Sequence, residues 1–142
     1  MSEIKINEKS AGVVIFRKEQ NGALFLLLHY PSGHWDFVKG KIEPEENLRQ
    51  TILRETREET GITDLDFLDG FEDSVEYDFQ YDGKLIHKKV IFYLAKTNTK
   101  KITISHEHLD FVWLDFEKAF EKTTYQNAKL ILSKANQLIN RL

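Results

Sequence analysis

The chain has 142 residues, of which 41% are hydrophobic and 30% are charged, and its formal net charge is −3. This is the size and composition of one globular domain with room for a hydrophobic core, and we expect residues 1–142 to form a single domain. The slightly acidic balance argues against a stable nucleic acid partner, which usually requires a basic domain, and the lack of cysteines excludes disulfides and thiolate metal sites.

Neither a membrane span nor a signal peptide is apparent. The longest apolar run, Ala23–Leu28, is far shorter than the about 20 residues that a transmembrane helix needs. The polar segment Met1–Ser10 lacks the apolar core of a signal peptide. We therefore expect a cytoplasmic protein without a membrane partner, whose oligomeric state the sequence does not indicate.

The first part of the chain predicts a β-hairpin. Ala11–Arg17 and Ala23–Tyr30 are apolar and β-prone, and the Asn21-Gly22 pair between them is a strong hairpin signal. A loop then leads to a short extended segment, Trp35–Val38, and to a second loop around Gly40.

A capped helix should follow. Asn47 is a typical N-cap residue, the helix is expected to span Leu48–Thr60, and Gly61 supplies the left-handed residue that ends it.

The second half predicts strands at Leu65–Phe79 and Leu85–Thr97, with a turn at Asp82-Gly83, and a further strand at Asp110–Leu114. A short helical turn, Asp115–Phe120, comes next. A last, amphipathic helix is indicated by apolar residues at three- and four-residue spacing, namely Ala128, Ile131, Ala135, Leu138 and Leu142. Strands with helices at two separated places predict an α/β sandwich, in which helices cover both faces of a mixed sheet.

The predicted helix carries three acids on or beside its core-facing stripe. At about 100° per residue, Leu48, Ile52, Glu55 and Glu59 fall on nearly one stripe, and Glu58 lies beside it. Like charges at this spacing repel by about 0.2–0.5 kcal/mol per pair, and acids in the last turn oppose the helix dipole. Such a cluster favours cations, and oxygen-rich sites suit Mg²⁺ or Mn²⁺.

The alternative is a solvated helix whose acids are balanced by Arg54 and Arg57, and helix geometry alone does not separate the two. The wider sequence favours the metal site. Residues 40–62 read GKIEPEENLRQTILRETREETGI, which resembles the Nudix box in its glycines, first Glu, Arg-Glu and Glu-Glu at the expected spacing. One departure is Thr56, where an aliphatic residue is more usual. The resemblance implies that Glu46 and Arg54 form a supporting ion pair.

Membership of the Nudix family would imply an α/β/α sandwich and a Mg²⁺-dependent attack by water on a nucleoside diphosphate linked to another group, with Mn²⁺ as a second possible metal. Carried over by position, Glu55, Glu58 and Glu59 would bind the metal, together with the carbonyl of Gly40. One of these glutamates would be the general base. We favour Glu58, although the sequence does not separate it from Glu55.

Outside the box the chain resembles one branch of that family, the asymmetric diadenosine tetraphosphate hydrolases, along almost its whole length. The matching segments are AGVVIFR at 11–17, FLLL at 25–28, His34-Trp35 ahead of Lys39-Gly40, Asp69-Gly70-Phe71, and Ile104–His108 followed by Trp113-Leu114. This branch hydrolyses diadenosine tetraphosphate to AMP and ATP, so the resemblance implies a small dinucleotide substrate.

The same resemblance implies roles for further residues. Glu107 would be a fourth metal-binding carboxylate, and Tyr77 and Tyr125 would clamp an adenine. Contacts to the phosphate chain would come from His34, Lys39, Lys41 and Lys88. Simpler interpretations remain open. A strand tyrosine such as Tyr77 often only packs, Tyr125 is also placed to act as a hydrophobic staple, and the alternative for Lys88 is a solvated residue of the sheet.

Three other functions also remain open. The first is a Nudix enzyme that acts on another nucleoside polyphosphate or on an RNA 5′ end, although the low net charge counts mildly against RNA. The second is a non-catalytic nucleotide-sensing domain, and the intact set of acids argues against it. The last alternative is a structural or interaction domain with an acidic surface helix.

Overall fold

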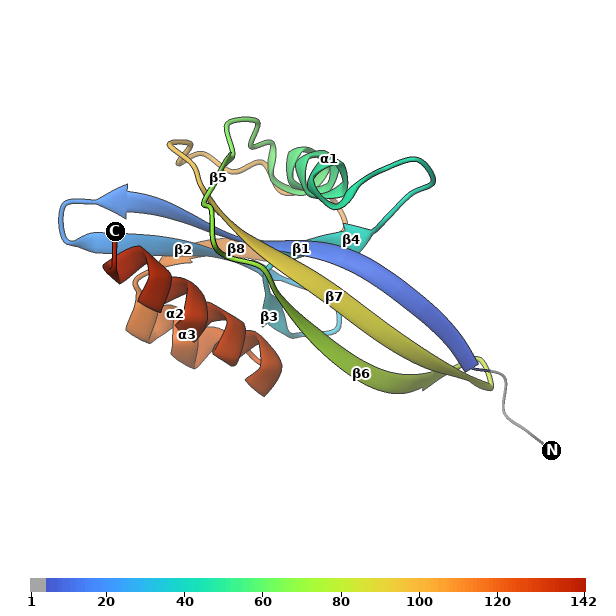
Figure 1. Cartoon of the computed structure of the whole chain (residues 1–142). Coiled ribbons are helices and arrows are strands. Elements are labelled where there is room, and N and C mark those ends of the chain that lie inside the picture. The colour runs from blue at the N-terminus through green and yellow to red at the C-terminus, as the bar shows by residue number, and fades with distance from the viewer. Residues whose placement is uncertain (1–4) are drawn as a thin grey trace.

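The computed structural model describes residues 5–142, so the first four residues of the polar N-terminal segment lie outside it. Within that range the chain forms one mixed sheet of eight strands, with helices on both faces (Figure 1). The strands are β1 (Lys5–Glu19), β2 (Gly22–His29), β3 (Trp35–Asp36), β4 (Val38–Lys41), β5 (Asp66–Phe67), β6 (Asp73–Tyr81), β7 (Lys84–Lys96) and β8 (Asp110–Leu114). The helices are α1 (Leu48–Thr60), α2 (Phe116–Lys122) and α3 (Gln126–Asn140).

β1 is the central strand. It pairs in parallel with β7 on one side, and antiparallel with β2 and then β4 along the other. β3 and β8 extend the sheet from β2, whereas β5 and β6 pair with successive parts of β7. This pairing confirms the predicted mixed sheet.

Successive side chains of the strands point to opposite faces of the sheet, where they form two separate hydrophobic cores. On one face Val13, Leu26 and Val38 pack with Ile52 of α1, and on the other Val14 and Phe92 pack with α3. Figure 1 shows α1 above the sheet and α2 and α3 below it. The expected α/β/α sandwich is therefore confirmed.

The bounds of α1 agree with the prediction because both ends are specified locally. Asn47 accepts a hydrogen bond from the backbone N–H of Gln50, and the Gln50 side chain accepts one from the N–H of Asn47, each at 2.8 Å. Gly61 ends the helix with φ +80°, a left-handed conformation that glycine adopts without strain. Because Ile52 of α1 is buried against the sheet, Glu59, seven residues later, faces the same side.

The single strand predicted at Leu65–Phe79 is wrong. The structure divides it into β5 and β6, because Gly70, with φ +87°, turns the chain between them. Both pieces then pair antiparallel with β7, at Phe67 opposite Ala95 and at Asp73 opposite Phe92.

Two smaller predictions also need correction. Gly40 lies in β4 opposite Ala11 of β1, and not in a loop, because the backbone of Val38–Lys41 pairs with β1. The last helix stops at Asn140, which leaves Leu142 75% exposed and outside the core.

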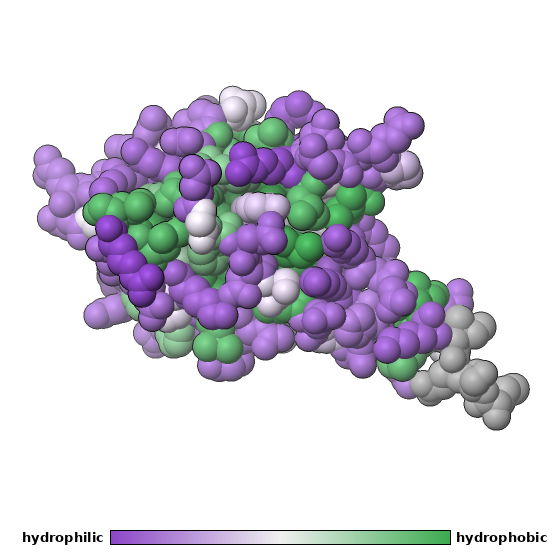
Figure 2. All heavy atoms as spheres, viewed as in Figure 1, coloured by the Kyte–Doolittle hydropathy of each residue, from purple (hydrophilic) through white to green (hydrophobic). Residues whose placement is uncertain are grey.

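The surface seen in Figure 2 is mostly hydrophilic, with hydrophobic patches between the polar side chains. Among the helices formed by residues 5–142, none combines the length and the apolar character needed to cross a membrane.

Candidate active site

The three acids of α1 differ sharply in their exposure. The side chain of Glu58 is 54% exposed and that of Glu55 is 16% exposed, whereas Glu59 is buried, with 5% of the residue exposed. Burial raises the pKa of Glu59 to about 9, and the charges of Glu55, Glu107 and Glu58 add to this effect. A merely solvated helix does not explain a buried acid of this kind.

The predicted fourth acid belongs to the same cluster. Glu107 lies in the loop before β8, and this loop is tied to the end of α1 by a backbone hydrogen bond from Ser105 N–H to the carbonyl of Glu59, at 3.2 Å. The structure therefore brings Glu107 to the acids of α1 although about fifty residues separate them in the sequence.

Gly40 provides the close approach between β4 and α1. A Cβ atom at this position would lie 2.2 Å from Cδ of Glu55, closer than two carbon atoms can pack. Glu55 therefore rests directly on the backbone of β4, beside the carbonyl that the Nudix resemblance assigns to metal binding.

Arg54 organises the outer side of the cluster. Its guanidinium donates to Glu46 at 2.7 Å and to Glu55 at 2.8 Å, and it contacts Glu58 at 3.4 Å. Hydrogen bonds from Arg54 lower the pKa of Glu46 to about 2, so this carboxylate stays charged. The predicted Glu46–Arg54 ion pair is confirmed, and Arg54 does not reach Glu59.

The donor set fits a hard divalent cation. All candidate ligands are oxygens, and Oε2 of Glu59 is buried without a hydrogen-bond partner among residues 5–142. Within the described part of the chain, however, no three acidic or histidine side chains are already spaced as a complete metal site. Binding would therefore require the carboxylates to turn toward the ion, as rotation away from Arg54 would allow.

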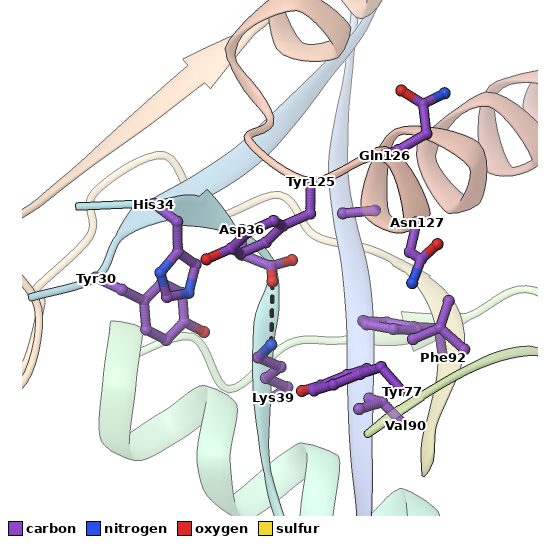
Figure 3. A pocket seen from close by; sticks show the side chains of 12 residues that line it. Tyr30, His34, Asp36, Lys39, Tyr77, Val90, Phe92, Tyr125, Gln126 and Asn127 are labelled. Carbon is purple, nitrogen blue, oxygen red and sulfur yellow. Dashed lines mark hydrogen bonds and ion pairs between the residues drawn. The ribbon is translucent and has the colours of Figure 1, made fainter. Parts of the chain in front are cut away.

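A cavity of about 660 Å³ lies on the α3 face of the sheet (Figure 3). Four of the six predicted substrate residues line it, namely His34, Lys39, Tyr77 and Tyr125. Tyr77 comes from β6 and Tyr125 precedes the first residue of α3, and Figure 3 shows their rings on different sides of the space. Its apolar wall consists of Val75, Val90, Phe92 and Ala128.

Lys39 is the cation that reaches this cavity. Asp36 accepts a hydrogen bond from its amine at 3.1 Å, and Figure 3 shows this contact at the edge of the space. Although burial opposes its charge, Asp36 keeps the pKa of Lys39 above its ordinary value. Lys39 is thus held protonated where a phosphate chain would need it.

Lys41 and Lys88 do not line the cavity. Lys88 pairs with Tyr77 across β6 and β7, and the amine of Lys41 lies 3.3 Å from Glu8. Lys39 and Lys41 lie two residues apart in β4, and Glu8, which contacts Lys41, is the partner of Lys88 across β1 and β7, so the three lysines lie on the same side of the sheet. Burial, and then the charge of Lys39, lower the pKa of Lys88.

Tyr30 and Asp36 are among the cavity residues that were not predicted as site residues. Tyr30 directly follows β2 and Asp36 ends β3, and neither belongs to a recognisable motif. Burial raises the pKa of Tyr30 well above its ordinary value, and the charges of Glu59, Asp36 and Glu55 raise it further. Tyr30 therefore lines the cavity and also packs on His108, next to Glu107, a placement that only the folded chain reveals.

Comparisons with known proteins agree with this geometry. The chain is 39% identical over 129 residues to the asymmetrical bis(5′-nucleosyl)-tetraphosphatase of Caenorhabditis elegans, which covers 89% of this chain and 92% of the relative. It is also 32% identical over 130 residues to the dihydroneopterin triphosphate diphosphatase of Haemophilus influenzae, covering 85% and 82% of the two chains.

Among solved structures, a binary complex of the C. elegans Ap4A hydrolase matches with a TM-score of 0.84 and 34% identity, over 95% of this chain and 99% of that one. Residues 7–134 match the model of the NUDIX domain. The chain therefore belongs to the NUDIX family.

Proposed function

We propose that the protein hydrolyses bis(5′-nucleosyl) tetraphosphates with the help of a divalent cation and cleaves diadenosine tetraphosphate asymmetrically into AMP and ATP. The observation that carries this proposal is the cavity bordered by Tyr77 and Tyr125, in which Tyr30 also packs on His108, the neighbour of Glu107. Aromatic side chains can stack on a nucleobase, and the adjacent lysines suit a phosphate chain. The C. elegans relative, 39% identical, is an asymmetrical tetraphosphatase.

The cation that we propose is Mg²⁺, with Mn²⁺ as a substitute. Its ligands would be the carboxylates of Glu55, Glu58, Glu59 and Glu107 and the carbonyl of Gly40. When bound, it would neutralise phosphate charge and lower the pKa of a coordinated water. The unpartnered Oε2 of Glu59 supports this assignment, because a buried carboxylate requires a compensating charge.

The residues of the chain divide the remaining work. Glu58 is the better candidate for the general base, because it is accessible to water and its contact with Arg54 is long, at 3.4 Å. Glu55 is held at 2.8 Å by Arg54. Lys39 and His34 would orient the phosphate chain and stabilise negative charge on the leaving group.

The activity can be tested by incubating the protein with Mg²⁺ and diadenosine tetraphosphate and separating the products by chromatography. We expect equimolar AMP and ATP, and no turnover in excess EDTA. Two molecules of ADP would refute asymmetric cleavage.

The H. influenzae relative gives a second candidate, dihydroneopterin triphosphate, whose planar pterin ring would also stack in an aromatic cavity. The assay panel should therefore include this compound and triphosphorylated RNA. A higher kcat/KM for either than for diadenosine tetraphosphate would reassign the substrate.

Replacing Tyr77 with Ala tests the base-binding role of the cavity. Stacking of a base on an aromatic ring is worth about 1–3 kcal/mol, so KM should rise by about 5- to 150-fold while kcat changes little. Tyr81→Ala is the control, because Tyr81 lies in the same strand, is 70% exposed and does not line the cavity. Unchanged KM and kcat in Tyr77→Ala would show that this ring does not hold the substrate.

A further inference from the structure

Tyr30 is fixed in place by its hydroxyl and by its backbone. Its hydroxyl, just after β2, donates a hydrogen bond at 2.5 Å to the carbonyl of Phe37, which lies between β3 and β4. Its backbone N–H donates to the carbonyl of His34 at 2.9 Å, and its own carbonyl accepts from Gly33 at 2.8 Å. These bonds close a tight turn and leave the ring little freedom to rotate.

The ring of Tyr30 supports two histidines from different loops. His34 stacks on it with a centroid distance of 4.7 Å and an interplanar angle of 7°, whereas His108 meets it edge to face at 4.7 Å and 75°. These distances are within the range in which aromatic rings attract each other. Figure 3 shows the rings of Tyr30 and His34 overlapping at the border of the cavity.

Besides Tyr30, His34 contacts Ser32 of its own loop and the ring of Tyr125, whose centroid lies 5.2 Å away at an interplanar angle of 46°. Residues 31–33 are exposed, and Gly33 has φ +98°. Nδ1 of His34 lies 2.6 Å from the hydroxyl of Ser32. In the tautomer in which Nδ1 accepts that hydrogen bond, Nε2 carries the proton and can donate it to a phosphate oxygen.

His108 connects the same ring to the acidic cluster. It is buried, with 6% of the residue exposed, and it directly follows Glu107. Its Nδ1 lies 3.3 Å from the hydroxyl of Ser105, whose backbone is bonded to the end of α1. A shift of the Tyr30 ring would therefore disturb both the loop that carries His34 and the loop that carries Glu107.

We infer that Tyr30 is a positioning residue, whose ring sets the imidazole of His34 against the phosphate chain and the Glu107 loop against α1. The inference rests on the proposed function for the identity of the substrate. The role belongs to the ring stack, and the hydroxyl contributes only the anchor to Phe37.

Two substitutions separate the ring from the hydroxyl. Tyr30→Phe keeps the stack, so kcat and KM for diadenosine tetraphosphate should stay within about threefold of the wild type. Tyr30→Leu removes the stack and should lower kcat/KM by about 10- to 100-fold, because a misplacement of about 1 Å in a site costs up to about this much. We expect both a higher KM, from His34, and a lower kcat, from the Glu107 loop.

A mutant cycle with His34→Ala tests whether Tyr30 acts through His34. The KM effects of Tyr30→Leu and His34→Ala should be strongly less than additive in the double variant, because both remove the same contact. Tyr93→Leu is the matched control: this half-buried tyrosine also has a bonded hydroxyl, to Glu72 at 2.7 Å, but lies outside the cavity. It should lower the melting temperature without changing KM.

Two measurements that require no hydrolysis test the role of Tyr30 independently of the proposed function. In NMR spectra of the metal-free protein, the His34 ring protons should be shifted upfield in the wild type and in Tyr30→Phe, and should lose that shift in Tyr30→Leu. The Kd for ATP in EDTA should rise in Tyr30→Leu by the same factor as in His34→Ala.

Two results would overturn the role of Tyr30 whatever the substrate proves to be. One is an unchanged His34 shift and ATP affinity in Tyr30→Leu. The other is a loss in Tyr30→Phe as large as that in Tyr30→Leu, which would assign the role to the hydroxyl. Absence of tetraphosphate cleavage by the wild type, with the shift and affinity changes as expected, would refute only the proposed function.

Discussion

The two long helices on opposite faces of the sheet bury different kinds of side chain. All buried residues of α3 are apolar, namely Ala128, Ile131, Leu132, Ala135 and Ile139. The buried residues of α1 comprise one isoleucine and four polar side chains, namely Thr51, Ile52, Thr56, Glu59 and Thr60. Helix α3 therefore has the composition of a structural element, whereas α1 gives up apolar burial where it carries its acids.

The difference also appears in hydrogen bonding. Among residues 5–142, buried oxygens of Thr56 and Glu59 have no partner, and α3 contains no such atom. A buried polar group left unpaired costs about 1–3 kcal/mol. The helix that we assign to catalysis therefore lowers the stability of the fold. Such a loss is common where a functional site requires polar groups that the folded structure leaves unpaired.

The largest expected effect comes from Glu58→Gln in α1. The substitution removes the proposed base and a metal ligand, so kcat should fall by about 10²- to 10⁴-fold. The melting temperature should stay the same, because the Glu58 side chain is 54% exposed. Glu121→Gln, at an exposed position of α2, is the control. A normal rate in Glu58→Gln would end its proposed role.

The reverse pattern is expected in α3. Leu132 is fully buried, and Leu132→Ala should lower the free energy of unfolding by about 2–5 kcal/mol, measured by urea denaturation. The kcat of the folded fraction should remain unchanged. Leu130→Ala, at a position 51% exposed in the same helix, should cost only about 0.5 kcal/mol. A reduced kcat in folded Leu132→Ala would contradict the division of roles between the helices.

A smaller effect of opposite sign is expected from Thr56→Val. The two side chains have nearly the same shape, and the change removes a buried hydroxyl without a partner among the described residues. The free energy of unfolding should rise by about 1 kcal/mol, with kcat unchanged. A loss of stability would show that the hydroxyl has a favourable contact, and would weaken the contrast between the helices.

The sequence predicts a structural feature well when residues close to it in the chain determine that feature, and poorly when contacts with distant segments do. The ends of α1 follow from Asn47 and Gly61, each of which acts on its own neighbours, so both were predicted correctly. The break at Gly70 was missed because β-prone residues flank it on both sides, and only pairing with β7 shows that the chain turns there.

The residues of the candidate site also differ in whether local sequence or long-range contacts bring them together. Glu55, Glu58 and Glu59 lie within one helix, so their clustering follows from helical geometry. Tyr30 comes near them only through contacts between β2, the 31–34 loop and the 104–108 loop, and a single sequence carries no signal for such contacts.

The most direct test of the account is a thermal unfolding experiment on the wild type and Glu59→Gln, each in EDTA and in Mg²⁺. At pH 7 in EDTA the variant should be the more stable protein, because Glu59, whose pKa is raised to about 9 by burial, must take up a proton on folding, whereas Gln need not. Mg²⁺ at about 100 times its Kd should stabilise the wild type by about 2.7 kcal/mol and the variant far less, so that their order reverses. Equal shifts in both proteins, or a wild type indifferent to Mg²⁺, would contradict the claim that α1 buries Glu59 in order to hold a cation.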